Sequence, residues 1–137
     1  KGFYYMGEAY KLMGNAEKAQ ESYQIAASAQ AQHWRQFSDE LFFKALSMRE
    51  LGKNKDADEV IASLKNGVNE QLNSSVVIDE YSKFGEDGSR AERLANLHYL
   101  NGLAFWYEGS KAKAKDEFGK SIKMNQNMIW PKVFINM

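Results

Sequence analysis

The feature that most constrains this chain is a spaced pattern of small and large apolar residues that occurs three times. From Gly7, the offsets +3, +7, +12, +16 and +19 hold Tyr10, Gly14, Ala19, Tyr23 and Ala26. The same offsets from Gly102 hold Phe105, Gly109, Ala114, Phe118 and Ser121. From Ala45 they hold Met48, Gly52, Ala57, Ile61 and Leu64, a looser copy in the same register. Internal repeats of this kind fold by stacking similar units, so the pattern restricts the possible folds.

Each copy predicts two antiparallel helices joined by a short polar turn. The residues at 0 and +3 share one face of the first helix, and the small residue at 0 lets a second helix approach closely. The glycine at +7 is expected to end the first helix in the left-handed conformation. The second helix then carries a small–large–small stripe at +12, +16 and +19.

Composition agrees with an all-α domain and excludes several classes of partner. The chain has 137 residues, enough for one domain with a real core, and only one proline, Pro131. Eighteen Lys and Arg balance 18 Asp and Glu, which disfavours nucleic acid, and the apolar runs are too short for membrane insertion. The absence of cysteine excludes disulfides and leaves the cytoplasm and the periplasm equally open. Because Lys1 leads directly into helical sequence without an N-cap residue, we expect a fragment of a longer protein.

The pattern resembles the tetratricopeptide repeat, a helix–turn–helix unit of 34 residues with small and aromatic residues in this order. The residues that define the copies are Gly7, Tyr10, Gly14, Ala19 and Tyr23, then Ala45, Gly52 and Ala57, then Gly102, Phe105, Gly109, Ala114 and Phe118. The resemblance implies a single domain over residues 1–137, folded as a right-handed α-solenoid. Its repeats would cover about residues 1–31, 38–66 and 95–126.

The intervals between the copies exceed the family period. Gly7 and Ala45 are 38 residues apart, so either the second helix of the first copy runs on through "ASAQAQHWRQF" or the linker is longer. Ala45 and Gly102 are 57 residues apart, which predicts an insertion at about residues 66–89. We expect "GEDGS" to form a surface loop, with Asp87 or Ser89 capping a helix that starts near Arg90. We expect residues 128–137 to form either a short capping helix or the start of another repeat, with Pro131 in the first turn of the helix.

The sequence offers little catalytic chemistry. Its histidines, His33 and His98, lack metal-ligand spacing and are expected to be structural or exposed. The adjacent carboxylates Asp116 and Glu117 would point in different directions on a helix, which suits a general acid/base pair poorly. We therefore predict no enzyme activity, no metal site and no cofactor.

What remains is surface recognition along the first helices. In stacked helix pairs these helices line a concave face, and the offsets −3, +1 and +4 are expected to face the groove. The predicted groove residues are Tyr4, Glu8, Lys11, Phe42, Leu46, Arg49, Tyr99, Leu103 and Trp106. Aromatic anchors of this kind serve peptide and sugar binding alike.

Three functional interpretations stay open at this point. The first is a protein-interaction scaffold that docks a peptide or a neighbouring domain in the groove. The second is a carbohydrate-binding or accessory module in which Tyr4, Phe42, Tyr99 and Trp106 act as stacking platforms. The third is architectural, with the groove filled by another domain of the same protein or by a second copy, including a homodimer through exposed solenoid ends.

The resemblance also bears on the partner. Family members that grip a chaperone's C-terminal carboxylate use basic and amide residues on the groove face, whereas Tyr4, Glu8 and Phe43 stand at the matching places here. That clamp is therefore not expected. The last third of the chain is also similar to the C-terminal repeat region of large bacterial proteins with sugar-processing-like domains, which implies an interaction arm.

Overall fold

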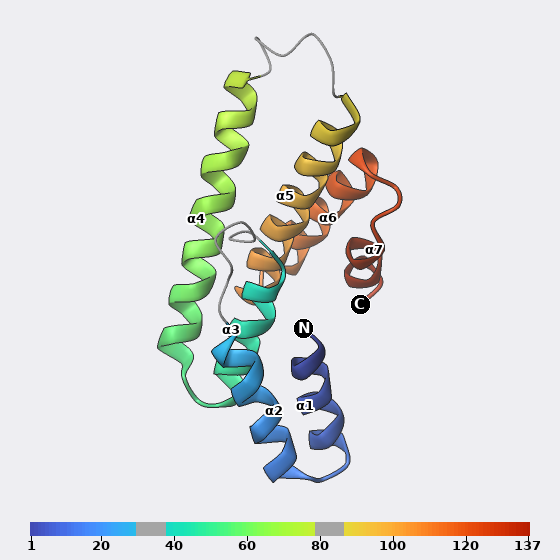
Figure 1. Ribbon diagram of the computed structural model, residues 1–137. Coiled ribbons are helices and arrows are strands. Elements are labelled where there is room, and N and C mark those ends of the chain that lie inside the picture. Colours follow the sequence, from blue (N-terminus) through green and yellow to red (C-terminus); the bar gives the residue numbers. More distant parts are fainter. Residues whose placement is uncertain (30–37, 79–86) are drawn as a thin grey trace. The chain divides into compact units, whose positions relative to one another are not determined.

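The computed structural model describes residues 1–29, 38–78 and 87–137. Within these ranges the chain is helical and contains no strand, which confirms the predicted all-α class. The helices are α1 (Gly2–Leu12), α2 (Ala16–Ser28), α3 (Glu40–Glu50), α4 (Asn54–Ile78), α5 (Asp87–Tyr107), α6 (Lys111–Met124) and α7 (Ile129–Ile135) (Figure 1). The pairs α1/α2, α3/α4 and α5/α6 coincide with the three copies of the sequence pattern, so the chain is helical and repeat-like.

The glycine at +7 ends the first helix of each pair, as the pattern predicts. The φ angles are +76° at Gly14, +79° at Gly52 and +85° at Gly109. Each glycine N–H donates to the carbonyl three residues earlier at 3.0–3.1 Å, and the next N–H donates to the carbonyl five residues earlier at 2.9 Å. This pair of hydrogen bonds is the Schellman motif, which satisfies helix-end carbonyls when the residue after the helix is left-handed. The three turns are therefore one structure used three times.

Close contact between the two helices explains the small residue at 0. A β-carbon on Gly7 would lie 2.5 Å from the Tyr23 ring, and one on Gly102 would lie 2.4 Å from the Phe118 ring. The backbone of the first helix thus approaches the aromatic ring at +16 more closely than any side chain allows. In the middle copy Ala45 replaces the glycine and Ile61 replaces the ring, and both are buried.

The predicted stripe of the second helices is buried in every copy. Its members are Ala19, Tyr23, Ala26, Ala57, Ile61, Leu64, Ala114, Phe118 and Ser121. The rings at +3 make cation–π contacts with lysines of the second helix. Lys18 Nζ lies 5.6 Å from the Tyr10 ring centroid, and Lys113 Nζ lies 5.7 Å from the Phe105 ring centroid. Both lysines stand at +11, so the offset pattern extends to a cation–π contact.

The chain divides into two compact units, residues 1–63 (unit 1) and residues 64–137 (unit 2). In unit 1, α1 packs on α2, and α3 packs on both. In unit 2, α5 packs on α6, and α6 packs on α7. The rings of α7 and α5 also meet, since the Phe134 and Tyr99 centroids are 6.5 Å apart.

Some boundaries differ from those expected. The predicted insertion is largely helical where it is described, because α4 continues to Ile78 and α5 begins at Asp87, with Ser89 inside it. The part of the expected "GEDGS" loop after residue 86 is therefore helix, and residues 79–86 lie outside the described ranges. Helix α2 ends at Ser28, and the rest of "ASAQAQHWRQF" from residue 30, including His33, lies outside them too. Helix α7 begins two residues before Pro131, which is buried in its first turn.

Enlarging the small residue at 0 is expected to destabilise the fold. Gly102→Ala should lower the free energy of unfolding by about 1–3 kcal/mol, because the new methyl group displaces the buried Phe118 ring. Gly119, on α6, is the matched control, since a β-carbon added there would have no neighbouring atom within 4 Å. Gly119→Ala should raise stability by up to about 1 kcal/mol through helix propensity. Urea denaturation measures both variants, and an unchanged midpoint for Gly102→Ala would contradict the close-contact explanation.

Candidate functional site

The candidate site lies in unit 1, where α1 and α3 leave a hollow of about 400 Å³. This α1–α3 hollow is lined by Tyr4, Leu46, Arg49, Glu50 and Asn54. Tyr4, Leu46 and Arg49 are predicted groove residues. The structure therefore brings one predicted residue of the first copy together with two of the second.

Tyr4 is held in place by neighbouring rings. Its centroid lies 5.5 Å from that of Phe43 and 6.2 Å from that of Tyr23. Burial, followed by the nearby carboxylates of Glu8 and Glu50, raises the pKa of the Tyr4 hydroxyl to about 12. The hydroxyl is protonated at neutral pH and can donate a hydrogen bond.

A second hollow of about 370 Å³ adjoins the first through Glu50, which lines both. We call it the Gln20 hollow; its lining is Lys11, Ala16, Ala19, Gln20, Tyr23, Glu50 and Leu51. Lys11 Nζ donates to Glu50 Oε2 at 2.9 Å, which joins the end of α1 to the end of α3. This hydrogen bond and the charge of Glu50 raise the pKa of the exposed Lys11 ammonium.

A buried hydroxyl holds the other carboxylate of this region. Tyr23 Oη donates to Glu8 Oε1 at 2.6 Å. Burial, and then this hydrogen bond, raises the pKa of Tyr23 above its ordinary range. Glu8 and Lys11, both predicted to face a ligand, thus already have partners within unit 1.

Three predicted groove residues belong to the core instead. Phe42 is 1% exposed, Tyr99 is 3% exposed and Leu103 is fully buried, so none of them lines an open groove. For Tyr99 the physical reason is that α7 brings the ring of Phe134 to this face, just as α3 brings Phe43 to Tyr4. Tyr4 packs on Phe43 of α3, and Tyr99 packs on Phe134 of α7.

Trp106 of α5 is the last of the nine predicted groove residues, and its side chain is half-buried. Its ring meets the Phe134 ring edge-on at 5.4 Å between centroids, and Lys111 Nζ lies 5.0 Å from its centroid. Helix α7 thus occupies the face of α5 on which the sequence predicted a groove.

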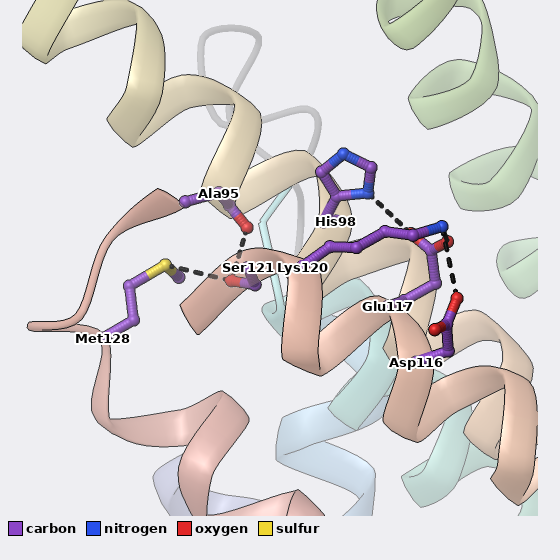
Figure 2. Close-up of polar contacts among 7 residues, drawn as sticks. All are labelled: Ala95, His98, Asp116, Glu117, Lys120, Ser121 and Met128. Carbon is purple, nitrogen blue, oxygen red and sulfur yellow. Dashed lines mark hydrogen bonds and ion pairs between the residues drawn. The ribbon is translucent and has the colours of Figure 1, made fainter. Parts of the chain in front are cut away.

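A polar cluster joins α5 and α6 in unit 2 (Figure 2). His98 Nδ1 donates to Glu117 Oε2 at 2.7 Å, and Lys120 Nζ donates to Glu117 Oε1 at 2.9 Å. Burial by itself would raise the pKa of the Glu117 carboxyl, but hydrogen bonds from His98, Lys120 and Asn101 lower it to about 2. Ser121 Oγ donates to the Ala95 carbonyl at 2.7 Å, so this hydroxyl is committed to the backbone.

The polar groups of this cluster are hydrogen-bonded to one another or to the backbone. The Glu117 side chain is 10% exposed and that of Asp116 is 70% exposed, although both carboxylates contact Lys120 Nζ, at 2.9 and 3.2 Å. The only described histidine that could act with Glu117 is His98, and the nearby hydroxyl of Ser121 bonds elsewhere. Across residues 1–29, 38–78 and 87–137, no group of three or more His, Cys, Asp or Glu side chains could hold a metal ion.

The residues that sequence reasoning missed are Glu50 and Asn54, and for Glu117 it missed the hydrogen bonds that the carboxylate accepts. Glu50 of α3 accepts a hydrogen bond from Lys11 of α1 and lines both hollows. Asn54, the first residue of α4, lines the α1–α3 hollow. The repeat pattern contained no signal for either, since neither position recurs with the same chemistry in the other copies. Among the described helices, none is long and apolar enough to cross a membrane.

Comparison of the chain with protein-family models, with curated proteins and with solved structures found no match.

Replacing the buried carboxylate should show how the α5–α6 cluster supports unit 2. Glu117→Gln is expected to lower stability at pH 7 by about 1–3 kcal/mol, because charge-assisted hydrogen bonds are lost. The folded pKa of Glu117, about 2, lies below its ordinary 4.5, so its contribution is present above pH 4.5 and is lost as the pH falls toward 2. Urea unfolding of wild type and variant between pH 7 and pH 2 should therefore show a gap that narrows with acid.

Asp116→Asn is the control for this measurement. Asp116 also contacts Lys120, at 3.2 Å, but from an exposed position. An exposed pair contributes about 0–1 kcal/mol, so this variant should stay near wild type. Equal effects of the two substitutions would contradict a special role for the buried carboxylate.

Proposed function

We propose that this chain is a tetratricopeptide-like interaction module without catalysis of its own, and that it docks an extended peptide segment of a partner in the α1–α3 hollow. The observation that carries the proposal is the hollow itself, which keeps Tyr4, Leu46 and Arg49 on its wall. The repeated helix pairs, with the same glycine turn in each, support the likeness to the repeat family.

The lining of the hollow suits a peptide backbone. The protonated Tyr4 hydroxyl and the Asn54 amide together offer donors and an acceptor for main-chain N–H and C=O groups. Leu46 adds an apolar contact beside them. Arg49 and Glu50 place both signs of charge at the wall, which favours a polar peptide over a uniformly acidic or basic ligand.

Three of the four rings named for the carbohydrate-binding alternative are covered, which weighs against it. A sugar platform needs a ring face open to solvent. Phe42 and Tyr99 are 1% and 3% exposed, and Trp106 contacts both Phe134 and Lys111. These contacts use the surfaces that a sugar would require.

The architectural interpretation applies to unit 2. Helix α7 brings Phe134, itself 4% exposed, against Tyr99, Trp106 and Phe118. This face of α5 is occupied by the chain's own helix. We therefore assign docking to unit 1.

A random peptide library displayed on phage and selected on the 137-residue chain tests the proposal. Selected peptides should lose at least about tenfold in affinity for Leu46→Ala and for Asn54→Ala, equivalent to about 1.4 kcal/mol. Ile25→Ala is the matched control, because Ile25 is 49% exposed on α2 and lines neither hollow. Fluorescence anisotropy measures the dissociation constants.

Two outcomes would contradict the proposal. One is a selection that yields no peptide above background. The other is a set of peptides that bind wild type, Leu46→Ala and Asn54→Ala equally, since those peptides would use another surface. Circular dichroism of each variant separates lost binding from lost folding.

A further inference from the structure

A third hollow of unit 1 is formed by α3 and α4 and has a volume of about 380 Å³. We call it the α3–α4 hollow; its lining is Leu41, Lys44, Met48, Asp56, Glu59, Val60 and Ser63. Leu41, Met48 and Val60 are half-buried and give the hollow an apolar wall. Its volume falls within the range of about 300–1,000 Å³ that is usual for ligand pockets.

The third copy of the sequence pattern shows how the same place is filled in unit 2. Each lining residue has a counterpart 57 residues later, and these counterparts are His98, Asn101, Phe105, Lys113, Asp116, Glu117 and Lys120. Two lysines occupy the place there. Lys113 Nζ lies 5.7 Å from the Phe105 ring centroid, and Lys120 Nζ contacts Asp116 at 3.2 Å and Glu117 at 2.9 Å (Figure 2).

The second copy keeps a carboxylate at this place but lacks both lysines. Glu59 is the counterpart of Asp116, whereas Asp56 replaces Lys113 and Ser63 replaces Lys120. Within the described part of the chain, neither Asp56 nor Glu59 has an ion-pair or hydrogen-bond partner. The α3–α4 hollow therefore presents two carboxylates where unit 2 supplies the cations from its own helix.

We propose that the α3–α4 hollow binds a basic side chain, lysine or arginine, of a partner protein. Asp56 and Glu59 are three residues apart on α4, so they share a face of the helix and can both contact one cation. Lysine and arginine combine an aliphatic stem with a charged head. The stem would contact the apolar wall of the hollow, and the head would take the place that the two lysines occupy in unit 2.

The charges of the hollow select a cation over other side chains. Lys44 is the cation among the lining residues, and its Nζ donates to the Ala29 carbonyl at 2.9 Å, so it is not paired with either carboxylate. An acidic side chain would be repelled by Asp56 and Glu59. An uncharged side chain would remove water from the carboxylates without compensating for the loss.

The α3–α4 hollow is separate from the α1–α3 hollow. Met48 lines the first and Leu46 lines the second, and at 3.6 residues per turn these two positions are about 160° apart around α3. Binding of a basic side chain and docking of a peptide in the α1–α3 hollow are therefore independent, and Leu46→Ala should affect only the latter.

Nuclear magnetic resonance of the isotope-labelled 137-residue chain tests the proposal. The probes are lysine, arginine and norleucine, each capped at its amino and carboxyl termini. Because Asp56 and Glu59 are exposed, a single basic side chain should bind in the millimolar range, with saturable shifts of the amide signals of α3 and α4. Norleucine has the stem of lysine without the ammonium, and it should bind at least tenfold more weakly.

Substitutions that restore the missing lysines should close the site. Asp56→Lys reproduces Lys113 of the third copy, and Ser63→Lys places an ammonium four residues after Glu59, as Lys120 follows Asp116. Each should weaken binding of capped lysine at least tenfold. Glu21→Lys is the matched control, since Glu21 is exposed on α2, stands at the same offset as Glu59 and undergoes the same change of charge as Asp56→Lys. It should leave the affinity unchanged.

Four results would overturn the proposal. Wild type could show no saturable shift up to the solubility limit of capped lysine, or it could bind norleucine equally well. Asp56→Lys and Ser63→Lys could both retain full affinity, or Glu21→Lys could lose as much as they do, which would indicate a general effect of charge. The spectra also report whether each variant is folded, and the comparison of lysine with norleucine on wild type depends on no variant.

Discussion

The contact between a glycine backbone and an aromatic ring is the constraint on which the first and last helix pairs depend. At Gly7 and Gly102 the ring of the second helix lies where a β-carbon would otherwise be. This contact sets the separation of the two helices, and that separation buries the whole small–large–small stripe of the second helix. The left-handed glycine at +7 then reverses the chain, and the ring at +16 of the second helix comes to lie opposite the small residue at 0 of the first. Both glycines therefore serve a single packing arrangement.

Packing between successive helices also explains where the candidate site lies. Rings on the first helices are used to hold the next first helix, as Tyr4 holds Phe43 and Tyr99 meets Phe134. In unit 2 this leaves the face of α5 covered by α7. In unit 1 the polar side chains around Glu50 hold α1 and α3 together without filling the space between them, and two hollows remain.

The offset pattern predicts only those features of the structure that depend on residues close in sequence or on helical periodicity. The offsets correctly placed the turns at Gly14, Gly52 and Gly109, because a helix end depends on residues close in sequence. They also placed the buried stripes, since helical periodicity determines which residues share a face. They failed for Phe42, Tyr99 and Leu103, because the direction of a side chain within a helix does not reveal whether other parts of the chain will bury it. The hydrogen bonds of Glu50 with Lys11 and of Glu117 with His98 could not be predicted for the same reason, since these partners lie 39 and 19 residues away.

The sequence by itself determined the helices, their glycine turns and the pairing of a small residue with a ring sixteen positions later. These are consequences of local backbone preference and of periodicity, and both can be read from a single chain. Only the tertiary structure decided which aromatic rings became core and where a hollow stayed open. Those outcomes depend on long-range contacts such as Lys11 with Glu50 and Phe134 with Trp106, which exist only after the helices have packed.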